Sequence, residues 1–146
     1  MLEPTMANIG RNTQTGLRRI TGLAILVFFL IGFSIHMTRP NYRRCDFFEK
    51  ELNGGNKEFG GVEYYAKLCG ANVQNGHEVR LQLFDGTGEL RAQRYFSYYV
   101  NSATERELAD GVGGIVYYDS SSSDVMQLLA IPPTKWDWIR ARLPLF

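Results

Sequence analysis

The residues best suited to covalent chemistry in this chain are its only two cysteines, Cys45 and Cys69. A lone cysteine pair in a small domain is typical of a disulfide that forms in an oxidising compartment. Closing a loop of about 25 residues would stabilise the fold by about 3 kcal/mol in the chain-entropy model. We expect the two cysteines to be joined, with two free buried thiols as the alternative.

Residues that could carry out catalysis are few after residue 40. The one histidine there, His77, opens a predicted strand, and the sequence supplies no recognisable nucleophile motif for it. The segment from Asp85 to Glu89 has neither the ligand spacing of a calcium loop nor the order of an aspartic protease motif, so it predicts a hairpin turn. The run from Ser120 to Ser123 lacks a Gly-x-Ser-x-Gly context and predicts a loop.

Metal and phosphate sites are not predicted either. The chain has no Cys-x-x-Cys motif and no paired histidines, so a zinc site would require an unusual set of carboxylates. No glycine-rich phosphate loop precedes a predicted helix. We therefore expect a protein that is not an enzyme and has no cofactor. A hydrolase whose carboxylates come from distant parts of the chain is a third and weaker hypothesis.

The side chains that remain are those that protein interfaces favour, because tyrosine and arginine are common interface anchors. The candidate protein-binding face comprises Arg91, Gln93, Tyr95, Tyr99 and, on an expected neighbouring strand, Tyr65. A competing interpretation, which the sequence alone favours, is that a C-terminal helix with Trp136 and Trp138 covers this face. In that arrangement Trp136 belongs to the core.

Alternating apolar and polar residues predict the strands that carry this face. One strand runs from Val62 to Cys69, and a hairpin follows with strands from Val79 to Leu83 and from Leu90 to Val100. An alternating polar face indicates an antiparallel sheet that is covered on one side. Arg94 interrupts the inner face of the last strand, which predicts either a bulge or an ion pair at the edge of the core.

Short helices are expected around these strands. Ser102 to Glu105 fits a capping box for a helix that reaches Asp110, and Thr134 with Asp137 fits the start of a final helix that ends at Leu143. Further segments are expected as a helix within 41–52, a strand at 115–118 and an ambiguous apolar segment at 125–131. The predicted fold class is α+β, a small domain with a four- or five-stranded antiparallel sheet and packed helices, preceded by a single N-terminal transmembrane helix.

The run from Ile20 to Met37 predicts that transmembrane helix, because it is uncharged and mostly apolar over 18 residues. As a helix it would span about 27 Å, close to the roughly 30 Å of a bilayer core. Its long lead-in and the absence of an Ala-x-Ala site favour a retained signal anchor over a cleaved signal peptide. A buried helix of a soluble domain usually has a polar face, and Leu23 to Ile31 has none.

Arginines flank this run on both sides, so the positive-inside rule does not orient it. Both cysteines follow the run, which favours an oxidising compartment on that side. We expect residues 1–19 to form a cytoplasmic tail, residues 20–37 the signal anchor and residues 41–146 an α+β domain in the periplasm. No Asn-x-Ser/Thr sequence occurs, which agrees with a bacterial inner-membrane protein.

Charge narrows the class of partner. From residue 41 onward the chain has 12 Lys and Arg and 14 Asp and Glu, a balance of −2, which lacks the electrostatic footprint of nucleic-acid binding. The expected partners are the lipid bilayer and another protein. Organisation alone favours an immunity protein that captures an envelope-targeting toxin, and the alternative is an accessory subunit of an inner-membrane secretion, division or transport complex.

Overall fold

The computed structural model describes residues 9–99 and 106–143 of the chain. Two units separate between Thr38 and Arg39, and each is described by itself. The first unit is the helix α1, Ile9–Thr38. Within the described residues, its segment Arg18–Thr38 is the one helix long and apolar enough to cross a membrane. Within this unit Leu23 is 63% exposed and Phe29 58% exposed, so contacts of the helix with itself do not explain its apolar composition.

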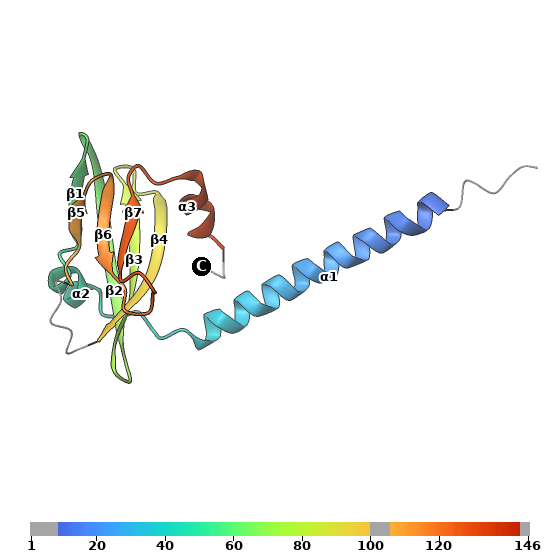
Figure 1. The fold of residues 1–146 in the computed structure, drawn as a ribbon, viewed down its shortest axis with the longest axis horizontal. Helices are drawn as coiled ribbons and strands as arrows, with labels where there is room; N and C mark the ends of the chain where they lie inside the picture. Colours follow the sequence, from blue (N-terminus) through green and yellow to red (C-terminus); the bar gives the residue numbers. More distant parts are fainter. Residues whose placement is uncertain (1–8, 100–105, 144–146) are drawn as a thin grey trace, which may run out of the picture. The chain divides into compact units, whose positions relative to one another are not determined.

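The second unit contains two antiparallel sheets (Figure 1). The first sheet has the order β1-β2-β3-β4, with β1 Gly55–Phe59, β2 Val62–Val73, β3 Gly76–Asp85 and β4 Leu90–Tyr99. The second has the order β5-β6-β7, with β5 Ala109–Gly111, β6 Gly114–Tyr118 and β7 Met126–Ala130. The α+β class and a four-stranded antiparallel sheet are confirmed, but the strand expected at 115–118 belongs to a second sheet and does not extend the first. β6 pairs with a strand on each of its edges, so it has no edge left for β4.

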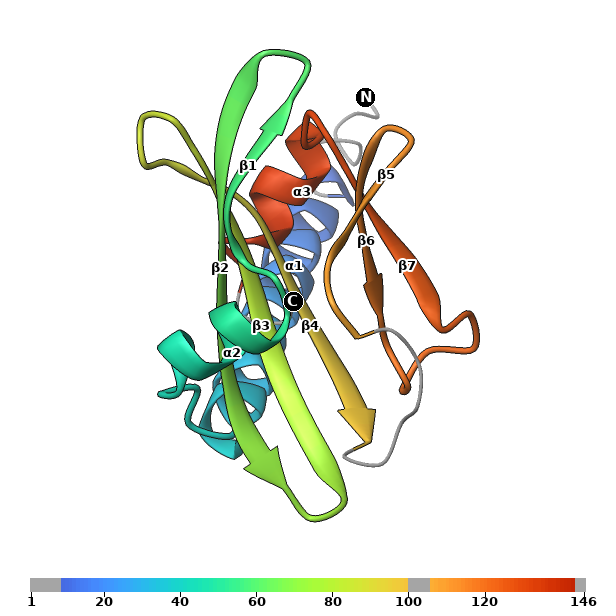
Figure 2. The same cartoon turned by 90° about the vertical axis from the view of Figure 1, so that its left-hand side faces the viewer.

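The core lies between the inner faces of the sheets and the helix α2, Cys45–Glu51. Figure 2 shows α2 in front of β2 and β3, with the second sheet beside the first. The rings of Phe96 and Tyr117 join the sheets, with 5.2 Å between their centroids. The most deeply buried large side chains are Phe48, Leu52, Leu68, Val79, Leu81, Leu83, Leu108, Ile115 and Leu129. The apolar residues that alternate along β2, β3 and β4 therefore face the core, as their spacing predicts.

Two glycine-containing segments, 53–56 and 70–76, contain strand residues although their composition is typical of turns. β2 continues to Val73 because Gly70 lies under Phe48, and a Cβ atom at this position would overlap the phenyl ring. The glycine marks a close approach of helix and sheet, and not a turn. β1 begins at Gly55 (φ 90°), directly after a turn that uses the positive φ of Asn53. Neither segment shows the alternation by which strands are recognised.

The region before β5 also departs from expectation. The predicted capping box, Ser102 to Glu105, lies outside the described residues. Its helix was expected to continue to Asp110, but Ala109–Gly111 is β5 and pairs with β6. The apolar segment at 125–131, ambiguous from its sequence, contains β7.

Arg94 forms an ion pair and not a bulge. The register shift of this hairpin lies between Leu83 and Phe84. The Arg94 guanidinium instead pairs with Asp137 in the first turn of the helix α3, Lys135–Arg140. Asp137 also accepts hydrogen bonds from the Thr134 amide (2.9 Å) and hydroxyl (2.7 Å). The predicted cap is confirmed, although the helix ends at Arg140 and not at Leu143.

The expectation that Trp136 lies in the core is wrong, because its side chain is 57% exposed. The residue of α3 that faces the core is Asp137, which its contacts with Thr134 and Arg94 hold in place. Trp138 is 39% exposed, and its indole N–H donates to the Glu89 carboxylate at 2.7 Å. Polar contacts, and not tryptophan burial, determine which face of this short helix packs against β4.

Replacing Phe48 with alanine should destabilise the domain by about 3–5 kcal/mol, because the phenyl ring is fully buried over Gly70. Phe47→Ala is the matched control on the same helix, since Phe47 is 44% exposed. Its cost should stay below about 1 kcal/mol. Denaturant unfolding of the detergent-solubilised chain, followed by tryptophan fluorescence, measures both. Equal losses for the two variants would contradict this placement of α2.

Candidate protein-binding face

The face of the first sheet opposite the core carries most of the candidate residues. Strand register aligns Lys67, Gln82 and Gln93 in one row across the sheet, and Cys69, Arg80 and Tyr95 in the next. Residues directly opposite each other in antiparallel strands project to the same side. We call this surface the outer face, and its members include Tyr65, Lys67, Cys69, Ala71, Glu78, Arg80, Gln82, Phe84, Gln93, Tyr95, Ser97 and Tyr99.

Four of the five predicted residues lie on the outer face. Gln93, Tyr95 and Tyr99 follow one another along β4, whereas Tyr65 lies on β2, opposite Phe84 of β3. β3 therefore separates Tyr65 from the other three. Arg91 lies at the register shift and turns toward the hairpin, where it pairs with Glu89 at 3.1 Å and with Asp85 at 3.9 Å.

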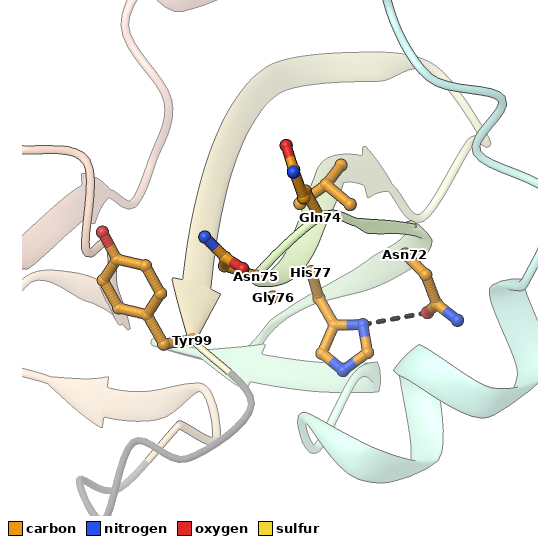
Figure 3. Close-up of a pocket in the computed structure, with 7 residues that line it drawn as sticks. Asn72, Gln74, Asn75, Gly76, His77 and Tyr99 are labelled. Carbon is orange, nitrogen blue, oxygen red and sulfur yellow. Dashed lines mark hydrogen bonds between the residues drawn. The ribbon is translucent and has the colours of Figure 1, made fainter.

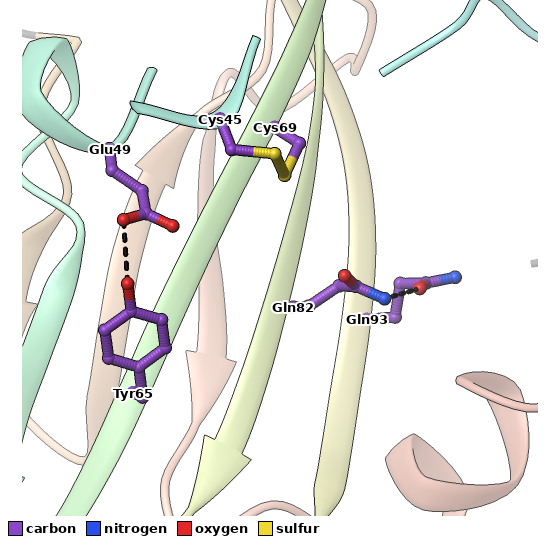
Figure 4. Close-up of a disulfide and its surroundings, with 6 residues drawn as sticks. All are labelled: Cys45, Glu49, Tyr65, Cys69, Gln82 and Gln93. Carbon is purple, nitrogen blue, oxygen red and sulfur yellow. Dashed lines mark hydrogen bonds between the residues drawn. A yellow bond between two sulfur atoms is a disulfide. The ribbon is translucent and has the colours of Figure 1, made fainter. Parts of the chain in front are cut away.

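Hydrogen bonds between side chains order part of this face (Figure 4). The Gln82 amide donates to Gln93 at 2.8 Å. Gln93 in turn donates to the Tyr95 hydroxyl at 3.0 Å. The Tyr65 hydroxyl donates to the Glu49 carboxylate of α2 at 2.8 Å. That hydrogen bond is the main cause that raises the pKa of Tyr65 above its ordinary value. These contacts hold amide and phenol groups in defined positions on a sheet.

The disulfide between Cys45 and Cys69 is present, as the sequence predicts (Figure 4). It joins the first residue of α2 to the middle of β2. Next to it, the backbone of Arg44 bridges to Gly70. β1 pairs with β2 only as far as Ala66, so the start of α2 lies along the part of the β2 edge that β1 leaves open.

The segment that precedes α2 packs on the outer face. The Arg39 guanidinium lies 3.8 Å from the centre of the Tyr95 ring, and the Tyr42 ring lies 5.6 Å from the same ring. The Tyr42 hydroxyl donates to Glu78, and Arg80 lies over the Tyr42 ring. Burial, followed by the hydrogen bond to Glu78, raises the pKa of Tyr42.

These contacts replace the cover that was expected from the C-terminal helix. α3 pairs with Arg94 in the middle of β4, while Tyr95 is contacted by Arg39 and Tyr42. The sequence gives no sign of this, because Tyr42 and Tyr95 are far apart along the chain and neither belongs to a motif. Tyr99 remains 58% exposed and Tyr65 38% exposed.

A second cluster at the hairpin end of β4 was also missed. Glu89 accepts hydrogen bonds from Trp138 at 2.7 Å, from Arg142 at 3.2 Å and from Arg91 at 3.1 Å. The Arg142 guanidinium also stacks 3.8 Å from the Trp138 ring. The Trp138 bond, and then Arg91, lower the pKa of Glu89. Glu89 and Trp138 are 49 residues apart in the sequence, so no local pattern could reveal this cluster.

A pocket of about 590 Å³ lies at the tip of the β2–β3 hairpin (Figure 3). Amide groups and Tyr99 form much of its lining, and His77 Nδ1 lies 3.0 Å from Asn72 Oδ1. Burial, followed by the charges of Arg44 and Arg106, lowers the pKa of His77. The lining residues include no acid, serine, threonine or cysteine. In the part of the chain that the structure describes, no group of three His, Cys, Asp or Glu residues could hold a metal ion.

Comparison with family models, curated proteins and solved structures finds no match to this chain.

Lowering the pH should remove the stabilisation that Asp137 provides. Burial acts to raise its pKa, but hydrogen bonds from Thr134 and Arg94 outweigh burial and hold the pKa below its ordinary value. A carboxyl group whose pKa is lower in the folded state stabilises the fold fully at pH values above its unfolded-state pKa of about 3.9. This stabilisation is lost as the pH falls through the pKa of the folded state. At pH 7 Asp137→Asn should cost about 1.5–3 kcal/mol.

Denaturant unfolding of the wild type and of Asp137→Asn, measured from pH 7 to pH 3, tests this. The difference in unfolding free energy should shrink as the pH falls below about 4, because the unfolded wild type then binds a proton at this carboxyl group while the folded state still keeps it charged. A difference that stays constant over this range would exclude a charged Asp137 as its cause.

The unreduced protein should contain no thiol that reacts with an alkylating reagent, since both cysteines are joined. After reduction in denaturant, mass spectrometry should detect two alkylated thiols. Cys69→Ser should lower the unfolding free energy by about 3 kcal/mol, because it releases a loop that the bond closes over a separation of 24 residues. Two labelled thiols before reduction would contradict both the bond and the oxidising compartment inferred from it.

Proposed function

We propose that this chain is a single-pass protein of the bacterial inner membrane. Residues 1–19 lie in the cytoplasm, residues 20–37 cross the bilayer and the domain from residue 41 onward lies in the periplasm. The exposed apolar surface of α1 supports the membrane assignment. The disulfide supports the orientation, because such bonds form in the periplasm and are rare in the cytosol.

The function we propose is non-catalytic capture of another protein by the outer face, with the chain acting as an immunity protein against an envelope-targeting toxin. The observation that carries this proposal is the exposure of Tyr99 and Tyr65 on a sheet that hydrogen bonds and a disulfide hold in place. Tyrosine supplies a large contact area and a hydroxyl group with few rotatable bonds, which suits it to interface hot spots. A fixed backbone also reduces the entropy that binding must remove.

The flanks of this face add the other side chains that interfaces favour. Trp138 and Arg142 lie at the hairpin end of β4, where both contact Glu89. Arg39 and Tyr42 contact Tyr95 farther along the strand. The balance of −2 from residue 41 onward is compatible with a basic protein as the partner.

One observation favours the alternative, an accessory subunit of an inner-membrane secretion, division or transport complex. A Cβ atom added at Gly22 would meet nothing within 4 Å, so a helix of another protein could approach α1 closely there. In that case the sequence of the membrane helix itself carries specificity.

Affinity capture with the full chain in mild detergent should recover one secreted toxin in a stoichiometric amount. Tyr99→Ala should weaken its binding by about 2 kcal/mol, roughly 30-fold in Kd, if Tyr99 is an anchor of the interface. Val112→Ala is the matched control, because Val112 is fully exposed in the turn between β5 and β6, outside the outer face. Calorimetry with the captured partner measures both variants.

Replacing residues 20–37 with an unrelated transmembrane helix separates the two candidates. Capture by the domain needs only a tether, so protection against the toxin should persist. Loss of function after this replacement, or recovery of several inner-membrane proteins in place of one secreted partner, would favour the accessory subunit.

A further inference from the structure

The strand β7 forms an unprotected edge of the second sheet. It pairs with β6 on one side, and no strand within the described residues pairs with its other side. Its sequence, Met-Gln-Leu-Leu-Ala, contains no charge and no proline. Met126 is 49% exposed and Leu128 52% exposed. Natural sheet edges are usually protected by charges, prolines, bulges or a covering segment, so a bare and apolar edge indicates a pairing site.

The hydrogen bonds to β6 show which backbone groups face this edge. The Val125 carbonyl accepts from the Asp119 amide, and the Ile131 amide donates to the Gly113 carbonyl. In an antiparallel pair, alternate residues bond to the neighbouring strand, so positions 125, 127, 129 and 131 face β6. Positions 126, 128 and 130 therefore direct their backbone groups outward. The Met126 amide donates to the Asp124 carboxylate at 3.3 Å, so a strand that pairs here must replace this one hydrogen bond.

We propose that β7 pairs with β7 of a second copy of this chain, antiparallel and about a two-fold axis at Leu128. The two Leu128 residues then exchange backbone hydrogen bonds, and Met126 of each copy lies opposite Ala130 of the other. The two three-stranded sheets join into one continuous sheet. Such an isologous contact closes on itself and yields a dimer without further growth.

Charge favours a second copy as the occupant. The strand is uncharged, and the nearest flanking acid, Asp124, falls opposite Pro132 of the other copy in this register. The two-fold pairing thus brings no like charges together, which would weaken a cross-strand pair. On the exposed side, Leu128 lies next to Val116 of β6. The apolar surface formed by Val116 and Leu128 therefore continues from one copy to the other where the two β7 strands pair. Homodimer interfaces are likewise more apolar than transient interfaces.

Sedimentation of the full chain in detergent micelles over a range of concentrations tests the proposal. The wild type should show a monomer–dimer equilibrium. Leu128→Lys places two ammonium groups opposite each other, so the dimer dissociation constant should rise at least about tenfold. Val112→Lys adds the same charge at a fully exposed turn of the same sheet, and its dissociation constant should equal that of the wild type.

Cross-linking provides a second readout that does not depend on the stability of a charged variant. Opposed residues of a hydrogen-bonded antiparallel pair have Cα atoms about 5.5 Å apart, which a disulfide can span. Under mild oxidation Leu128→Cys should give a covalent dimer, whereas Gln127→Cys, which faces the other side of the strand, should not. Thermal unfolding of each variant shows whether the domain remains folded.

Three outcomes would overturn the proposal. One is a wild type that stays monomeric at every concentration. Another is a dimer that persists equally in Leu128→Lys, which would place the contact in α1 or elsewhere. The third is Leu128-dependent binding of a different protein by a monomeric chain, which would make β7 a site for a foreign strand. The residues of β7 lie outside the outer face. The absence of this dimer would therefore leave the proposed capture function intact, and the absence of a captured partner would leave the proposed dimer intact.

Discussion

Cys45 begins α2 and Cys69 lies in the middle of β2, so the bond between them fixes a helix to the sheet at a point where β1 no longer covers the edge. Several other contacts depend on this connection. Phe48 reaches the core over Gly70 only when α2 lies along β2. The segment that stacks Arg39 and Tyr42 on Tyr95 leads directly into the bonded cysteine. One covalent constraint thus organises the core on one side of the sheet and the outer face on the other.

The ion pairs of the domain differ from this disulfide, and from one another, in the free energy that they contribute. The pairs of Glu89 with Arg91 and Arg142 are more than one-third exposed, and such surface pairs contribute at most about 1 kcal/mol each. The pair of Arg94 with Asp137 is different, because Asp137 is 8% exposed and Arg94 16% exposed. Removing one member would leave the other buried without its partner, which is costly even where the intact pair adds little net stability. This pair specifies where α3 lies more than how stable the domain is.

Local patterns in the sequence were sufficient for the elements with regular periodicity. Alternation along β3 and β4 predicted their inner faces, and the spacing of Thr134 and Asp137 predicted the cap of α3. Periodicity failed where long-range contacts decide the structure. Gly70 looks like a loop residue because the phenyl ring that requires it comes from α2. Trp136 looks like a core residue because nothing local shows that Arg94 holds Asp137 inward instead. The cover of Tyr95 by Tyr42 belongs to the same class of nonlocal contacts.

The two surfaces proposed for binding differ in the way that transient and permanent interfaces differ. The outer face combines tyrosines with arginines and amides that already bond to one another, which suits a partner that binds and leaves. The β7 edge is uncharged and offers a row of backbone groups, which suits a contact between identical chains. Because the two surfaces belong to different sheets, a β7 dimer would present two copies of the outer face in one particle. A partner with two matching sites would then bind the second copy at a high effective concentration, so dimerisation would increase its retention without any new contact at the face itself.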